Sequence, residues 1–135
     1  MNRAELGDFG RRYAAAWCSQ DPANVARFFA EDGSLTVNDG DPAVGRAAIA
    51  DVARAFMTAF PDMVVTMDQI VAREEGAIFR WTLTGTNTGP GGTGKGVRIS
   101  GQETWRLADD RLIAASRGAF DAAEYARQLE HGADG

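Results

Sequence analysis

The sequence predicts a single α+β domain in which three helices wrap a curved antiparallel sheet, in the order α-α-β-α-β-β-β-β-α. Apolar residues recur every three or four positions over most of the first half of the chain, as in helices, and every second position over 63–120, as in strands. The length of 135 residues is typical of one domain. Helices and strands kept apart in this way define the α+β class, and the concave face of such a sheet must be filled by side chains or by a ligand.

The first two helices follow from apolar spacing and from a proline. Residues 3–19 have one apolar helical face, formed by Leu6, Phe9, Tyr13 and Trp17. A second, short helix begins at Pro22, which suits a first turn because it needs no backbone N–H there, and Asp21 can be its N-cap. This helix is expected to continue to a stop at 31–33. The lone Cys18 has no partner for an intrachain disulfide.

A strand and the third helix come next. The strand is expected over 34–37, followed by a turn rich in Asn, Asp and Gly. The helix is expected over 46–60 and ends before Pro61, which lacks a backbone donor and restricts the residue before it.

Four strands and a last helix complete the chain. The strands are expected over 63–73, 77–86, 97–107 and 111–120. The helix is expected over 121–129, with Asp121 as its N-cap. Short turns separate the strands, except for a longer glycine-rich connection over 86–96. We therefore predict an antiparallel meander within one domain over 1–130, followed by a polar tail over 131–135.

Charge and composition argue against several classes of function. The net charge is −5 and the basic residues are scattered, so we expect no nucleic-acid partner. No run approaches the roughly 18 apolar residues of a membrane span, and the N-terminus lacks an apolar export segment, so we expect a cytoplasmic protein without a membrane partner. With His131 as its only His, the chain cannot build a His-based metal cluster or a Ser-His-Asp triad, and we expect neither metal nor cofactor.

Glu103 is the most informative residue, because it interrupts an apolar strand face. The other members of that face are Val97, Ile99, Gly101, Trp105 and Leu107. A buried carboxyl must either find a positively charged partner or hold its proton with a raised pKa. The sequence therefore predicts either an ion pair of Glu103 with Arg80 or Arg117, or an acid/base group in a pocket.

Other side chains could complete such a site. Tyr13 lies on the apolar helix face, and its buried phenol needs a partner that a carboxyl can supply. Asn38, Asp39 and Asp41 follow the first strand, where they could simply make a turn or present a general base, with Asp39 as the candidate. Large aromatic residues could fill the core or form a hydrophobic substrate wall. They are Trp17, Phe28, Phe56, Phe60, Phe79, Trp81 and Trp105.

Four segments cover nearly the whole chain: AAWCSQDPANVARFFAEDGSLTVNDG, AVGRAAI, FRWTLTGTNTGPGGTGKGVRISGQETWRL and AFDAAEY. In their order and spacing they resemble the SnoaL-like branch of the NTF2-like superfamily. The resemblance implies a conical α+β domain with an internal pocket, frequently dimeric through the outer sheet surface, so we expect a homodimer that binds a small hydrophobic molecule. Members include ketosteroid isomerases, polyketide cyclases, limonene-epoxide hydrolases and non-catalytic binders, among which fold alone does not choose.

Matching residues one by one counts against two of these activities. The cyclases and epoxide hydrolases that resemble this chain carry an Asp on the last strand, and that position falls here on Gly118. The epoxide hydrolases also use an Arg and an Asp two residues apart on the third strand. Arg80 matches the first, but Thr82 occupies the second position.

The ketosteroid isomerases match better. They place a Tyr on the first helix and a carboxylic acid on the penultimate strand, and these positions fall on Tyr13 and Glu103. Their general base falls between Val37 and Asp39, which leaves its identity open.

Three functions follow as hypotheses. In the first, Asp39 moves a proton of an enolisable hydrophobic carbonyl compound, ketosteroid-like or polyketide-like, while Tyr13 and Glu103 stabilise the enolate. The second is non-catalytic binding of a hydrophobic metabolite, which the missing Asp at position 118 supports. The third is a polyketide cyclase whose acid/base residue has moved to Glu103.

Overall fold

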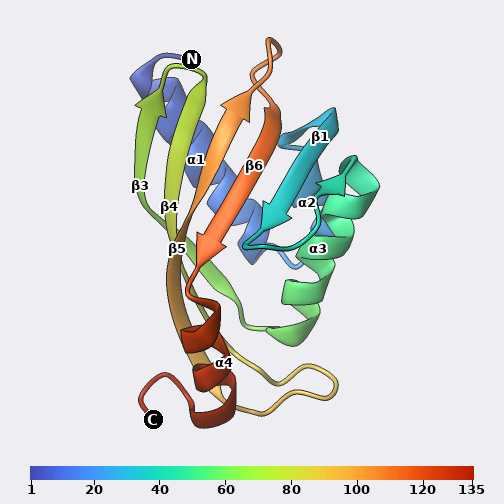
Figure 1. Cartoon of the computed structure of the whole chain (residues 1–135), viewed down its shortest axis with the longest axis vertical. Helices are drawn as coiled ribbons and strands as arrows, with labels where there is room; N and C mark the ends of the chain where they lie inside the picture. The colour runs from blue at the N-terminus through green and yellow to red at the C-terminus, as the bar shows by residue number, and fades with distance from the viewer.

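The computed structural model describes residues 1–135 and has one six-stranded sheet with three helices on one face and a fourth beyond its end (Figure 1). The helices are α1 (Arg3–Cys18), α2 (Pro22–Ala26), α3 (Arg46–Ala59) and α4 (Ala122–His131). The strands are β1 (Phe29–Val37), β2 (Ala43–Val44), β3 (Val64–Arg73), β4 (Gly76–Thr86), β5 (Gly96–Leu107) and β6 (Ile113–Phe120). The predicted α+β class is confirmed, with the short β2 as an added element.

The sheet is mixed rather than wholly antiparallel. Strands β3 to β6 form the expected antiparallel meander, but β1 pairs with β6 in parallel and carries β2 on its other edge. Local periodicity identifies strands, but it does not reveal the direction in which strands distant in sequence pair. The parallel pair is important for the site because it sets Leu35 beside Ser116 and Val37 beside Gly118.

Strand β1 starts earlier than expected, and α2 ends earlier. Phe29 is the first residue of β1 and is completely buried. The pairing with β6 shifts register between Phe29 and Ser34, where a Cβ on Gly33 would lie 2.8 Å from the carbonyl oxygen of Ile113. Glycine at this position therefore permits a bulge, which a 3.6-residue periodicity does not predict.

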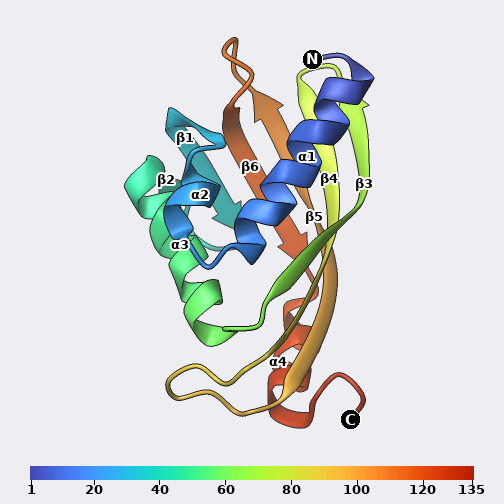
Figure 2. The same cartoon turned by 180° about the vertical axis from the view of Figure 1, so that it is seen from behind.

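Helices α1, α2 and α3 cover the same face of the sheet (Figure 2). Helix α1 begins with a capping box between Asn2 and Glu5 and packs across β3. The approach is close at Gly10, where a Cβ would lie 2.6 Å from the Sδ of Met67. The side chain of Cys18 exchanges hydrogen bonds with the backbone of Val65, so the end of α1 is tied to the start of β3.

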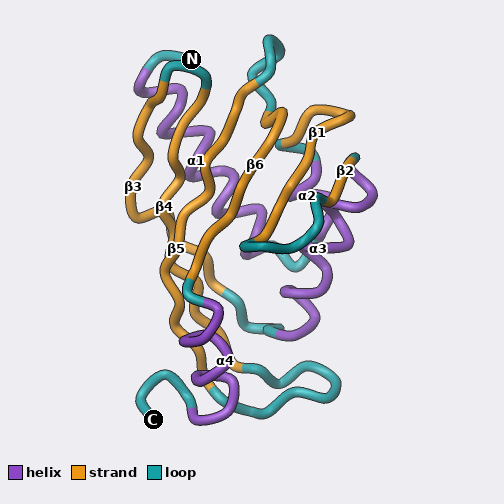
Figure 3. Tube along the Cα trace, in the orientation of Figure 1, coloured by secondary structure: helices purple, strands orange, loops and turns teal.

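Helix α4 lies beyond the end of β6, at the opposite end of the molecule from the N-terminus (Figure 1). The glycine-rich connection between β4 and β5 is the long loop near this end (Figure 3). It rests against the end of α3, because the Asn87 side chain donates to the carbonyl oxygen of Ala59. None of the helices is long and apolar enough to cross a membrane.

Candidate functional site

A cavity of about 70 Å³ lies between the helices and the concave face of the sheet. Its 13 lining residues come from all of the helices except α2 and all of the strands except β2, and 11 of them are hydrophobic. Glu103 on β5 is the carboxylic acid among them, and Gly118 lies beside it on β6. The strand alternation thus directs Glu103 into an apolar cavity, as the sequence predicts.

The Glu103 carboxyl is held by three side chains from three elements. The Tyr13 hydroxyl on α1 lies 2.9 Å from Oε1 and 3.1 Å from Oε2. The Ser116 hydroxyl on β6 donates to Oε1 at 2.7 Å, and the Trp105 indole N–H on β5 donates to the same oxygen at 3.1 Å. Oε1 is therefore crowded with donors, whereas Oε2 has only the Tyr13 contact.

Burial dominates the acidity of this carboxyl. Only 7% of Glu103 is exposed, and loss of water raises its pKa above the ordinary glutamate value. The hydrogen bonds from Ser116, Trp105 and Tyr13 act in the opposite direction, because they stabilise the ionised form, but they only partly offset the desolvation. The group is thus a stronger base when ionised and a more persistent acid when protonated than a glutamate in water.

Tyr13 stands behind the carboxyl and is not part of the cavity wall. It is completely buried, and its ring meets those of Phe79 and Trp105 edge-on at 5.2 Å. Burial raises the pKa of Tyr13 well above its ordinary value, and the neighbouring Glu103 charge raises it further. The phenol therefore stays protonated and hydrogen-bonded to Glu103, which is the pairing that the sequence predicts.

The indole N–H of Trp17 is a buried donor without a partner. It is close enough to the Tyr13 hydroxyl to lower the pKa of that phenol, but it does not reach hydrogen-bond geometry. Trp17 also lines the cavity. An unpaired buried donor of this kind costs about 1–3 kcal/mol.

The ion pair offered as an alternative for Glu103 does not form. Arg80 is exposed on the outer face of the sheet and donates to Gln69, and Arg117 is exposed on the same outward alternation of β6. Successive side chains of a strand point to opposite faces, and each arginine directly follows or precedes a residue that points inward. Both arginines therefore point away from Glu103. That prediction was wrong, and the carboxyl is satisfied by neutral donors instead.

The seven aromatic residues predicted as a substrate wall divide into two groups. Trp17, Phe56, Phe79 and Trp81 line the cavity. Phe28, Phe60 and Trp105 do not: Phe28 packs against Phe9 and Tyr13, Phe60 is completely buried, and Trp105 stacks on Phe79 at 5.1 Å. Apolar spacing identifies inward residues, but it cannot separate those that face a cavity from those that fill the core.

The loop after β1, which holds the predicted general base, lies outside the cavity. Asp39 and Asp41 are exposed and lie outside the cavity lining. Asn38 has a left-handed backbone with φ of 51°, and its side chain accepts from the backbone N–H of Phe120 at 2.9 Å. It therefore joins the ends of β1 and β6, which is turn chemistry rather than catalysis.

Sequence reasoning missed two polar residues of the site. Ser116 shares the inward alternation of β6 with Gly118 and Phe120, a signal that was present but carried no chemical motif. Tyr125 on α4 lines the cavity at the end of β6, and its partial burial raises the pKa of its phenol. Its signal in the sequence was a single aromatic residue in the last predicted helix.

The SnoaL-like domain family matches residues 10–115. The chain belongs to this family. No curated protein matches the chain in sequence. The chain shares its fold with solved structures described as NTF2-like and ketosteroid isomerase-like, so the expected α+β, NTF2-like architecture is confirmed.

Solved structures with the same fold support this assignment. AclR from Streptomyces galilaeus, a candidate hydroxylase, is 23% identical over 95% of this chain and 86% of its own, with a TM-score of 0.79. A candidate SnoaL-like polyketide cyclase from Jannaschia sp. CCS1 is 13% identical over 96% and 97%, with a TM-score of 0.75. A ketosteroid isomerase-like protein from Catenulispora acidiphila, solved with trimethylamine, is 16% identical over 90% and 88%, with a TM-score of 0.75. Structural similarity to proteins of such low sequence identity shows that this SnoaL-like protein shares their fold.

Proposed function

We propose that this SnoaL-like protein is an enzyme that binds a small hydrophobic carbonyl compound and moves a proton on it, with Glu103 as the acid/base group. The observation that carries the proposal is a carboxyl with a raised pKa inside an otherwise apolar cavity.

The proposed step uses one carboxyl twice. Ionised Glu103 removes the proton on the carbon next to the carbonyl, so that a C–H bond breaks, an O–H bond forms on Glu103 and the substrate becomes an enolate. The newly neutral acid then returns the proton, either to another enolate carbon in an isomerisation or to the alkoxide formed when the enolate closes a ring. Hydrogen bonds from Tyr13 and Ser116 hold the carboxyl in place in both states.

Asp39 has no part in this scheme, although the sequence offered it as the base. Its carboxyl lies in an exposed turn outside the cavity. Glu103 instead occupies the neighbourhood of the position at which the related cyclases carry their acid. Glu103 and Gly118 are direct cross-strand partners, and a Cβ on Gly118 would lie 3.8 Å from the Cγ of Glu103. The Glu103 carboxyl on β5 can therefore reach the part of the cavity that a carboxyl at position 118 on β6 would reach.

The test is deuterium incorporation next to the carbonyl of acetone, cyclohexanone and a 3-ketosteroid in D₂O, followed by mass spectrometry. We expect Glu103→Gln to lower the rate by about 100-fold or more, because general acid/base groups contribute on that scale. The control Asp39→Asn should keep the wild-type rate. Unchanged exchange in Glu103→Gln, or no exchange above buffer in the wild type, would refute the assignment.

A second candidate is non-catalytic binding of a hydrophobic metabolite. It is favoured by one observation, the engagement of Oε1 of Glu103 with three internal donors, which is also what a purely structural buried acid would show. Binding of the same ketones with no deuterium incorporation would establish this second function.

We also propose that the protein is a homodimer that uses the outer face of the sheet, as its resemblance to the family implies. That face carries polar side chains already paired with each other, including Thr82 with Asp68 and Ser100. Light scattering coupled to size-exclusion chromatography should give twice the mass of the 14.4 kDa chain. A mass of one chain at micromolar concentration would contradict the dimer.

A further inference from the structure

The cavity is small for the proposed ligand. Its volume is about 70 Å³, whereas an apolar cavity of about 150 Å³ is known to admit benzene and drug-sized ligands occupy roughly 300–1,000 Å³. If the proposed function holds, a substrate larger than a few heavy atoms can be fully enclosed only if one wall of the cavity moves.

Most of the wall cannot move without exposing the core. Phe79 and Leu35 belong to strands paired on both sides and are 0% and 3% exposed. Tyr125 shares its partial burial with Phe56 and Trp81. It differs because α4 has a single buried residue, whereas α3 and β4 each have several. Its ring packs against Phe120 and Phe60 at centroid distances of 5.5 and 6.4 Å, at the end of the cavity where β6 stops.

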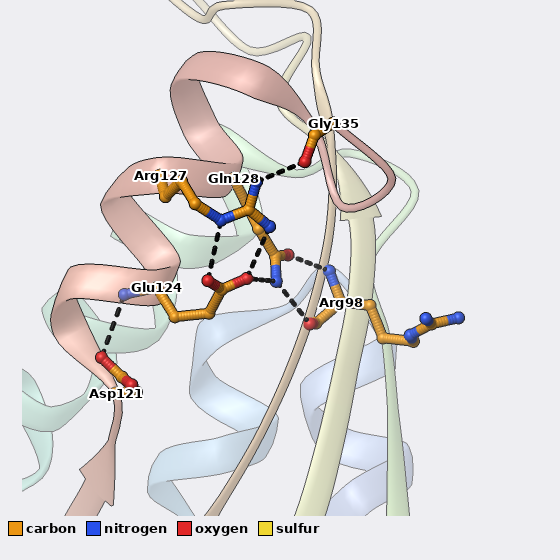
Figure 4. Close-up of polar contacts among 6 residues, drawn as sticks. All are labelled: Arg98, Asp121, Glu124, Arg127, Gln128 and Gly135. Carbon is orange, nitrogen blue, oxygen red and sulfur yellow. Dashed lines mark hydrogen bonds and ion pairs between the residues drawn. The ribbon is translucent and has the colours of Figure 1, made fainter.

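Helix α4 is attached to the domain by polar contacts and by the partly buried Tyr125 and Leu129. Its single buried residue is Gln128, whose amide pairs with the Arg98 peptide of β5 (Figure 4). The side-chain oxygen accepts from the Arg98 N–H at 2.7 Å, and the side-chain nitrogen donates to the Arg98 carbonyl at 3.1 Å. Strand β6 ends its pairing with β5 at Gly101, so Gln128 takes the place of a strand on an otherwise open edge.

Neighbouring charges fix the orientation of this amide. Nε2 of Gln128 also donates to Glu124 at 2.7 Å, so turning the amide over would set its oxygen against two acceptors. Hydrogen bonds from Arg127 and Gln128 lower the pKa of Glu124 to about 2, which keeps it an ionised acceptor. Arg127 in turn donates to the carbonyl of Gly135 (Figure 4).

From these contacts we propose that α4 is the movable wall of the cavity and that Tyr125 determines the size of ligand it accepts. The Tyr125 ring fills space that a larger ligand takes, and the pairing of Gln128 with Arg98 sets how readily α4 lifts. Water can replace the Gln128 hydrogen bonds when the helix moves, whereas no comparable exchange exists for the fully buried aromatic rings of the sheet.

The first experiment enlarges the cavity and uses probes that carry no carbonyl. Binding of fluorobenzene and 1-fluoronaphthalene is measured by ¹⁹F NMR for the wild type, Tyr125→Ala and the matched control Tyr125→Phe. We expect Tyr125→Ala to raise the affinity for 1-fluoronaphthalene, relative to that for fluorobenzene, by about tenfold, which corresponds to about 1.4 kcal/mol. Tyr125→Phe should behave as the wild type. An unchanged ratio in Tyr125→Ala would overturn the role of this ring.

The second experiment releases the helix without changing the lining. Gln128→Leu keeps a side chain of similar size but removes both bonds to Arg98, and Gln69→Leu on the exposed outer face is its control. We expect hydrogen exchange of the Arg98 amide to accelerate by about tenfold in Gln128→Leu alone, as local opening becomes easier. Equal exchange in all three proteins would show that α4 is not held in this way.

These tests are independent of the chemistry at Glu103, because neither probe can lose a proton next to a carbonyl. If the wild type does not exchange ketone protons but Tyr125→Ala shifts the affinity ratio of the two probes, the proposal for α4 is supported and the proposed enzymatic function is refuted. If ketone protons exchange but Tyr125→Ala leaves the affinity ratio of the two probes unchanged, the proposed enzymatic function is supported and the proposal for α4 is refuted.

Discussion

Residue 103 shows how one buried side chain can fix both the stability and the chemistry of a site. Its pKa is raised from 4.5 by burial, so the folded protein binds this proton more tightly than the unfolded chain does. A group of this kind stabilises the fold below its unfolded pKa, and that contribution disappears as the pH rises through the folded-state pKa.

Glu103→Gln should therefore change how stability depends on pH. The unfolding free energy of the wild type should fall, relative to that of the variant, as the pH rises above 4.5, because only the wild type must ionise a buried acid. Urea unfolding of both proteins across this range measures the difference. A difference that stays constant or grows with pH would contradict the raised pKa.

Ser116 tunes the same group. Its hydroxyl lowers the pKa of Glu103 by donating to Oε1 at 2.7 Å, so Ser116→Ala should raise that pKa further and cost about 1–3 kcal/mol in unfolding free energy. Titration of the ¹³C-labelled Glu103 carboxyl follows the pKa directly. Ser100→Ala on the outer face is the control, and a pKa that moves down in Ser116→Ala would be inconsistent with this contact.

The elements that shape the site depend on two glycines on neighbouring strands. A Cβ on Gly101 of β5 would lie 2.5 Å from the carbonyl oxygen of Ala119 and 2.7 Å from the Trp81 ring. A Cβ on Gly118 of β6 would meet nothing nearer than 3.5 Å. The first glycine allows β5 and β6 to approach, whereas the second leaves the cavity open beside Glu103.

The two glycines should therefore respond differently to alanine. Gly101→Ala should lower the unfolding free energy by about 1–3 kcal/mol, as overpacking does, while Gly118→Ala should be tolerated. Thermal unfolding of the two variants compares them directly. Equal losses would mean that the close approach at Gly101 is not what constrains this part of the sheet.

At the same scale, apolar spacing predicted the helices and the four meander strands because each depends on residues close in sequence. The early start of β1 was missed because it depends on a bulge at Gly33, which the local pattern reads as the end of a helix. The parallel pairing of β1 with β6 was missed because these two strands are far apart in the sequence.

For the whole molecule, the sequence predicted the acid but not its surroundings. Alternation along one strand was enough to turn Glu103 inward and a helical stripe was enough to bury Tyr13, so their contact at 2.9 Å could be anticipated. The alternation of β6 turns Ser116 inward, but its contact with Glu103 depends on the register between β5 and β6. Tyr125 reaches the site through the docking of α4. No local pattern contains that register or that docking. The same limit explains why Phe28 and Phe60 belong to the core.

The proposed proton transfer by Glu103 is the central claim of this account, and its pH profile tests that claim most directly. Deuterium incorporation into acetone should rise with pH to a plateau, with a midpoint above 4.5, because the ionised carboxyl is the base and burial raises its pKa. The profile of Glu103→Gln should be flat and low. A wild-type profile without this rise, or one retained in Glu103→Gln, would contradict the account.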